Sequence, residues 1–185
     1  QVLTARAYTA PQVALIAAAQ TPRHGLATEL AYAAGLRAHE LLTLRRGEER
    51  AADPRPALAS KWQGRNGVIY TVHGKGGLVR EVLLPHALAE RLEAVRLDAP
   101  LAITDRGIHY QSHYDIGGGQ RWSNSVSAAS ERALGWSTGA HGLRHSYAQE
   151  RMAELQASLS RDAALTTVSQ EMGHFRPEIT ETYLR

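Results

Sequence analysis

The sequence lacks several residue types on which functional sites often depend. It contains no cysteine, which excludes disulfides, thiolate metal sites and cysteine nucleophiles. Its most hydrophobic stretch, 13–19, is far too short to span a bilayer, and no signal-peptide pattern opens the chain. We therefore expect a cytoplasmic protein with no membrane partner. Because the first residue is Gln1 rather than methionine, we also expect a fragment of a longer protein.

Lysine is nearly absent as well. Only Lys61 and Lys75 are lysines among the 21 basic residues of the 185-residue chain, and a general bias towards arginine accounts for most of this. A net charge of +3 permits nucleic-acid binding without requiring it. Against this background, a lysine placed inside the glycine-rich turn 74–77 is worth singling out.

The hydrophobic pattern predicts a mainly α fold with a small three-stranded antiparallel β-sheet, in one domain over 1–185. A hydrophobic content of 43% suits a soluble domain of this length. Periodicity and helix-end signals predict helices at about 11–20, 26–34, from 36, 86–97, 124–134, 141–155, 165–172 and 177–183. The region 57–85 resembles a three-stranded meander with turns at 64–67 and 74–77, whereas 47–59 and 104–120 are predicted to be irregular.

Two arginines have the chemistry to stabilise a phosphodiester under attack. In-line displacement places negative charge on the non-bridging oxygens, and preorganised donors stabilise that charge. A guanidinium provides paired hydrogen bonds and stays protonated. Arg37 follows the helix break at Gly35, and Glu40 lies within helical reach to orient it. Arg144 is the second candidate, because it shares one side of a predicted helix with His141.

The remaining candidates could supply a nucleophile and manage protons. Tyr183 is the candidate nucleophile; since a free tyrosine has a pKa of about 10, nearby guanidiniums and an imidazole would favour its phenolate. His141 and His174 are imidazoles that could donate hydrogen bonds and take up a proton. Lys75, at the tip of a predicted hairpin, is the candidate general acid for a departing alkoxide.

Taken together and in this order, these segments resemble the catalytic domain of the tyrosine recombinase family, the phage-integrase type. Residues 35–44 resemble the first-arginine box, and 74–85 resemble the β-hairpin lysine box. Residues 141–146 (HGLRHS) resemble the His-x-x-Arg box. Residues 172–183 resemble the last box, with the usual nine-residue step from histidine to tyrosine. The resemblance covers nearly the whole chain.

The resemblance implies a site-specific recombinase or integrase that cleaves and rejoins double-stranded DNA during integration or excision of a mobile element. It implies a 3′-phosphotyrosyl intermediate and a free 5′-hydroxyl, with no metal, ATP or other cofactor. It assigns catalysis to Arg37, Lys75, His141, Arg144, His174 and Tyr183. It adds Glu40 as the partner that orients Arg37, and DNA contacts from Lys75 and Arg80.

Two departures from the family pattern accompany this resemblance. The amino-terminal DNA-clamping domain of the family has no counterpart within 1–185, and Met172 stands where leucine is commoner. The full-length protein would assemble as a tetramer on DNA, whereas this fragment is expected to be mainly monomeric. The segment from Pro177 onward is predicted to be the least stable part, with Tyr183 held loosely or displaced from the other candidates.

Simpler interpretations of the same residues stay open. Each motif alone would be an ordinary surface or packing feature, and Arg80 suits a phosphate contact and a plain strand position about equally. The histidine pairs 141/145 and 109/113 could bind zinc, although no acidic third ligand sits nearby. A type IB topoisomerase or telomere resolvase would share the chemistry. A non-catalytic DNA-binding regulator with the same fold and, more distantly, a metal-dependent nuclease would each fit part of the pattern.

Overall fold

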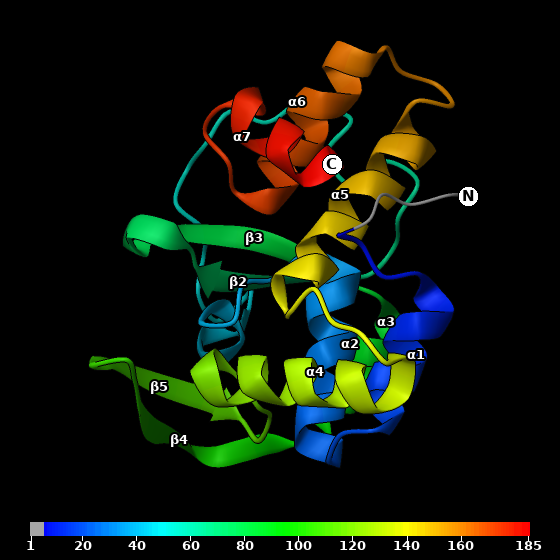
Figure 1. Ribbon diagram of the computed structural model, residues 1–185. Helices are drawn as coiled ribbons and strands as arrows, with labels where there is room; N and C mark the ends of the chain where they lie inside the picture. Colours follow the sequence, from blue (N-terminus) through cyan, green and yellow to red (C-terminus); the bar gives the residue numbers. More distant parts are fainter. Residues whose placement is uncertain (1–5) are drawn as a thin grey trace.

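Helices pack beside and above a small antiparallel sheet in the computed structural model, which describes residues 6–185 (Figure 1). The lower helices are α1 (Ala10–Ala18), α2 (Pro22–Ala34), α3 (His86–Glu93) and α4 (Gly119–Leu134). The upper helices are α5 (His141–Leu155), α6 (Arg161–Met172) and α7 (Pro177–Glu181), followed by the 3-10 turn η3 (Thr182–Leu184). The strands are β1 (Arg45–Arg46), β2 (Val68–His73), β3 (Val79–Leu84), β4 (Arg96–Asp105) and β5 (Ile108–Tyr114).

The predicted fold class is confirmed, since the chain is mostly helical and carries one three-stranded antiparallel sheet with the order β1-β2-β3. Two core clusters stabilise it. The larger one joins α1 to α4 with the sheet, and the smaller one joins α5, α6 and the C-terminal segment. Within residues 6–185 no helix is long and apolar enough to cross a membrane.

The end of α2 places the first site segment. Gly35 caps this helix at φ 66°, in the left-handed region that favours glycine. A side chain there would also approach the Tyr147 ring to 2.9 Å. The predicted third helix from Leu36 is wrong: turns lead into a short 3-10 segment, η1 (Glu40–Thr43). The Arg37 backbone N–H donates to the Glu40 carboxylate at 2.7 Å, a contact typical of a helix start, but only the four residues of η1 follow it.

The sheet differs from the predicted meander in its third strand. That strand is β1, which precedes the long loop, and not a segment within 57–64. Residues 59–64 form turns beside α6, where the backbone N–H groups of Leu58 and Trp62 donate to Gln170 and Glu171. Side-chain acceptors on α6 therefore replace a strand partner for this polar segment, and no hairpin turn forms at 64–67.

A second, two-stranded sheet of β4 and β5 occupies much of the region predicted to be irregular. Its turn is tight, with Arg106 at φ 48° and Gly107 at φ 78°. Most residues of β4 are exposed or only partly buried on both faces, so the strand carries no clear alternation of apolar and polar residues. The helix predicted to reach Leu97 ends at Glu93 because β4 begins at Arg96.

Candidate active site

A single buried carboxylate organises the candidate site. Glu40 is fully buried, and its oxygens accept from Arg80 Nε at 3.1 Å and Arg80 Nη2 at 2.9 Å. Arg37 Nη1 donates to the same carboxylate at 3.2 Å, and Arg144 Nη1 lies 3.9 Å away. Burial alone would raise the pKa of Glu40, but the charges of Arg80 and Arg144 outweigh it and lower the pKa to about 2. One negative charge therefore faces three positive ones.

Arg80 joins three parts of the chain that are distant in sequence. Besides holding Glu40, its Nη1 donates to the Glu171 carbonyl at 2.8 Å, just before the segment that carries His174. Gly173 makes room for it, since a side chain at this position would come within 2.5 Å of Arg80 Cδ. With its guanidinium buried and fully engaged, Arg80 suits a positioning role better than the predicted DNA contact.

Arg144 lies at the centre of the cluster and is fully buried. It donates to the Gly35 carbonyl, to His174 Nε2 at 2.9 Å and, at 3.4 Å, to the Met172 carbonyl. Burial, and then the charge of Arg37, lower its pKa to about 10, so it remains charged at neutral pH. Its Nε is buried without a hydrogen-bond partner among the described residues, which leaves one donor to satisfy.

A directed chain of hydrogen bonds fixes the His174 ring. Because Arg144 can only donate, His174 Nε2 must accept, and the ring proton is on Nδ1. Nδ1 lies 2.7 Å from Thr180 Oγ1, which lies 2.7 Å from Ser169 Oγ. Ser169 donates its own proton to the Leu165 carbonyl. The chain therefore runs from His174 through Thr180 to Ser169, and the last two positioning residues were not predicted from sequence.

Tyr183 is docked in the cluster, so the expectation that it is displaced is wrong. Its hydroxyl lies 2.8 Å from His141 Nε2, and its ring stacks on His174 with centroids 5.3 Å apart. The Arg144 guanidinium lies 5.3 Å from the ring centroid. The Tyr183 carbonyl lies 3.1 Å from His145 Nδ1, which anchors the segment through its backbone. The tail was expected to be unstable because it is short, but docking supplies the contacts that its own helix lacks.

Both candidate histidines are held in the neutral form. Burial, and then the charge of Arg144, lower the pKa of His141 to about 4 and that of His174 to about 3. His141 keeps an exposed edge, so solvent screens part of this effect. Arg37 acts on both in the same direction, which places its charge near them. His141 can therefore accept a proton from the Tyr183 hydroxyl, whereas His174 Nε2 already accepts from Arg144.

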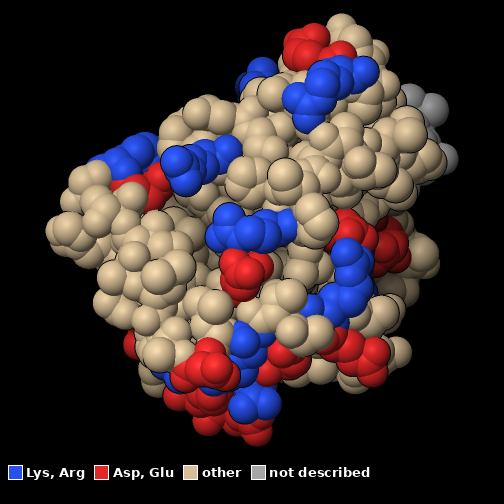
Figure 2. Space-filling view, turned by 90° about the horizontal axis from the view of Figure 1, so that it is seen from below, with Lys and Arg blue, Asp and Glu red and all other residues tan. Residues whose placement is uncertain are grey.

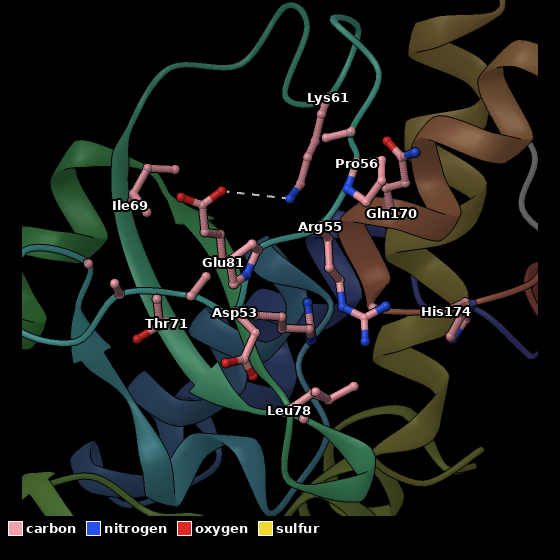
Figure 3. Close-up of a pocket in the computed structure, with 18 of the residues that line it drawn as sticks. Asp53, Arg55, Pro56, Lys61, Ile69, Thr71, Leu78, Glu81, Gln170 and His174 are labelled. Carbon is pink, nitrogen blue, oxygen red and sulfur yellow. Dashed lines mark ion pairs between the residues drawn. The ribbon is translucent and has the colours of Figure 1, made fainter.

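Lys75 stands apart from the rest. It is exposed at the tip between β2 and β3, and within residues 6–185 no hydrogen bond or ion pair holds its ammonium. It lines a cavity of about 860 Å³ that also reaches His174. Figure 3 shows this cavity between the strands and α6, with His174 at one side and the ion pair of Lys61 and Glu81 across it at 3.7 Å. The cavity connects the hairpin to the cluster.

No group of three histidine, aspartate or glutamate residues that could hold a metal ion occurs in the described part of the chain. His141 and His145, one of the two histidine pairs considered for zinc, both face Tyr183. His109, of the other pair, bonds Thr104 Oγ1 at 2.8 Å.

The sequence matches no protein-family model and no curated protein. The structure matches solved structures of the XerH site-specific recombinase. Its post-cleavage complex with a palindromic difH substrate gives a TM-score of 0.59 at 18% identity, covering 97% of this chain and 49% of that chain. Its pre-cleavage complex with difH gives a TM-score of 0.58 at 19% identity, covering 100% and 51%.

The chain has a tyrosine recombinase catalytic-domain-like fold. The resemblance predicted from the sequence boxes is thereby confirmed at the level of the fold. At such low identity the likeness carries the fold alone, and the chain spans about half the length of the solved chains that it matches. The roles of individual residues rest on the geometry described above.

We expect Glu40→Gln to destabilise the protein by about 3–5 kcal/mol, because it leaves buried guanidiniums without their counter-charge. The folded-state pKa of Glu40, about 2, lies below its usual 4.5, so its contribution is present above pH 4.5 and is lost as pH falls towards 2. Urea unfolding across this range measures it. Glu131→Gln, an exposed carboxylate on α4, is the control. Equal pH dependence in native protein and Glu40→Gln would contradict the assignment.

Docking of the C-terminal segment is tested by hydrogen exchange. Tyr183→Ala should speed exchange over 177–185 by about 10² or more, because truncating a buried aromatic ring costs about 3–5 kcal/mol. Tyr183→Phe keeps the ring and should retain most of the protection. Rapid exchange of this segment in the native chain would show that it is not docked in solution.

Proposed function

We propose that the chain is the catalytic domain of a site-specific DNA recombinase, which cleaves and rejoins duplex DNA through a 3′-phosphotyrosyl intermediate. The observation that carries this proposal is the contact of 2.8 Å between the Tyr183 hydroxyl and a neutral His141 beside the buried Arg144. A nucleophile, a proton acceptor and a cationic donor are thus brought together from α5 and η3.

In the proposed reaction the Tyr183 oxygen attacks the scissile phosphorus and its proton passes to His141 Nε2. Burial, and then the charge of Arg144, lower the pKa of His141. An incoming phosphate would offset the second of these, so the imidazole becomes a better base when DNA is bound. The bond from phosphorus to the 5′ oxygen breaks as the bond to Tyr183 forms. Rejoining reverses these steps, with a 5′-hydroxyl as the nucleophile.

The charge that develops on the phosphate oxygens would be stabilised by Arg37 and Arg144. Their geometry is fixed by Glu40 before substrate arrives, so little reorganisation is needed during the reaction. The unpartnered Arg144 Nε is a donor that such an anion could satisfy. His174 would hold Arg144 in place, because its Nε2 accepts from that guanidinium.

Lys75 would protonate the departing 5′ oxygen. Among the described residues no partner holds its ammonium, and the glycines around it let the hairpin tip follow the DNA. The two solved structures with the same fold contain DNA substrates, which supports duplex DNA as the partner here. Integration or excision of a mobile element and assembly of the full-length protein into a tetramer on DNA belong to this proposal.

A library of nicked duplexes with randomised sequence tests this function without knowledge of the target. The chain should form an adduct that resists detergent, mapped to Tyr183 by peptide mass, and the trapped DNA should share a sequence. Tyr183→Phe should form no adduct, whereas Tyr32→Phe, which removes a hydroxyl bonded to Glu150, should behave as native. An adduct in Tyr183→Phe would overturn the assignment. DNA binding without any adduct would favour a regulator, and trapped DNA without a shared sequence a topoisomerase.

The role of Lys75 has its own test. Lys75→Ala should fail to cleave ordinary DNA but should cleave a duplex whose bridging 5′ oxygen is sulfur, because a thiolate leaves without a proton. Lys61→Ala, whose ammonium is paired with Glu81 instead, should cleave both substrates. If sulfur fails to restore cleavage by Lys75→Ala, Lys75 is not the acid.

A further inference from the structure

A second cluster of buried charges joins α5 to α6 and takes no part in the proposed reaction. Arg151 and Glu171 are both fully buried, and Arg151 Nε and Nη2 each donate to the Glu171 carboxylate at 2.8 Å. Ion pairs such as Arg161 with Glu181 lie instead at the surface, and on the face in Figure 2 lysines and arginines lie beside aspartates and glutamates. Because desolvation can offset the attraction within a buried pair, such a pair is better explained by the geometry that it fixes.

The Glu171 carboxylate accepts from four donors. Besides the two from Arg151, the Tyr147 hydroxyl donates at 2.7 Å and the Trp62 backbone N–H at 3.0 Å. Trp62 has φ 64°, a left-handed conformation that is strained for a bulky residue and persists only where its surroundings hold it. Burial lowers the pKa of Arg151, but its bonds to Glu171 outweigh this and raise it. The carboxylate therefore joins α5, α6 and the segment 58–65.

The backbone of Glu171 belongs to the candidate active site. Its carbonyl accepts from Arg80 Nη1 at 2.8 Å, and the next carbonyl, of Met172, lies 3.4 Å from Arg144 Nη2. Both carbonyls are at the C-terminal end of α6, where the helix leaves acceptors unpaired and its dipole favours a cation. Since one residue has its side chain in the second cluster and its carbonyl in the site, a rotation of the α6 end would alter the contacts of both guanidiniums.

Tyr147 provides another connection between the two clusters. Its hydroxyl donates to Glu171, and its ring lies against Gly35, where a Cβ would approach it to 2.9 Å. The Gly35 carbonyl in turn accepts from Arg144. Arg144 is therefore held at Gly35 and at Met172 by backbone groups that the second cluster keeps in place.

We propose that Glu171 is a positioning residue for the reaction, which fixes Arg80 and Arg144 by holding the end of α6 against α5 and the segment 58–65. Its carboxylate acts through these guanidiniums and does not touch the substrate. The consequence for catalysis rests on the proposed function, whereas the positioning of the guanidiniums rests on the contacts alone. Residues 58–65, which contain none of the candidate catalytic residues, thereby contribute to the site through the Trp62 N–H.

The test first measures the free chain by nitrogen-15 NMR. The Arg80 Nε–H, which bonds Glu40 at 3.1 Å, should exchange with solvent about tenfold faster or more in Glu171→Gln, since about 1.4 kcal/mol of lost holding free energy corresponds to tenfold. Tyr147→Phe keeps the ring and loses one donor, so it should show a smaller increase. Because it loses a single hydrogen bond, it carries the same measurements should Glu171→Gln fail to fold.

The same variants are then compared in single-turnover adduct formation on the nicked duplex, at a temperature where circular dichroism shows them folded. At saturating DNA the rate should fall about tenfold or more in Glu171→Gln, because misplacing catalytic groups by about 1 Å can cost 10²-fold, whereas DNA affinity should not change. Glu154→Gln is the matched control. Glu154 also bonds Arg151, at 2.7 Å, but it is half-exposed and its other partner is Arg65, outside the site, so this variant should behave as native.

Native Arg80 exchange in the folded variants would overturn the proposal. Faster exchange with an unchanged rate of adduct formation would also overturn it, because Glu171 would then be structural only. An adduct from the native chain with no effect of either variant removes the positioning role and leaves the recombinase. No adduct from the native chain, together with faster Arg80 exchange in the variants, removes the recombinase and keeps the positioning of Arg80.

Discussion

The Glu40 carboxylate, buried among three guanidiniums, is the interaction on which the site depends. A buried carboxylate is costly unless it is paired, and three buried or half-buried arginines would repel one another without it. The carboxylate and guanidiniums therefore make each other's burial possible. Because Arg37, Arg80 and Arg144 come from three separate elements, this charge balance also fixes the relative positions of the α2 end, β3 and α5.

The charges of the three guanidiniums and the Glu40 carboxylate do not cancel, and this contributes to the neutral form of the two histidines. Three guanidiniums and one carboxylate leave two positive charges inside the cluster. Burial, and then that surplus, keep His141 and His174 neutral, so one can accept the phenol proton and the other can accept from Arg144. An anion is the ligand that would complete the balance. In the proposed reaction, the same field that favours a phosphate would also favour the protonation states that attack on it requires.

Local patterns predicted the parts of the site that are local. The break at Gly35, the helix carrying His141 and Arg144, and the cap at Gly173 follow from backbone preferences of nearby residues. Contacts between segments that are distant in the sequence could not be predicted from such local patterns. Strand β1 pairs across a long loop, β4 lacks an apolar face, and the bond from Arg80 to Glu40 spans forty residues. The docking of Tyr183 depends on side chains of α5 that its own segment does not reveal.

The proposed nucleophile, Tyr183, and the proposed general acid, Lys75, are held in very different ways. The nucleophile is fixed through its hydroxyl, its ring and its backbone, whereas Lys75 is exposed on a tip of glycines, with no partner among the described residues. In the proposed reaction, placing the acid on a hairpin tip that lines the cavity beside His174 would make protonation of the leaving group depend on where bound DNA holds that tip. Binding energy from DNA contacts at the tip would then position the acid, so that contacts remote from the scissile bond would act on the chemical step.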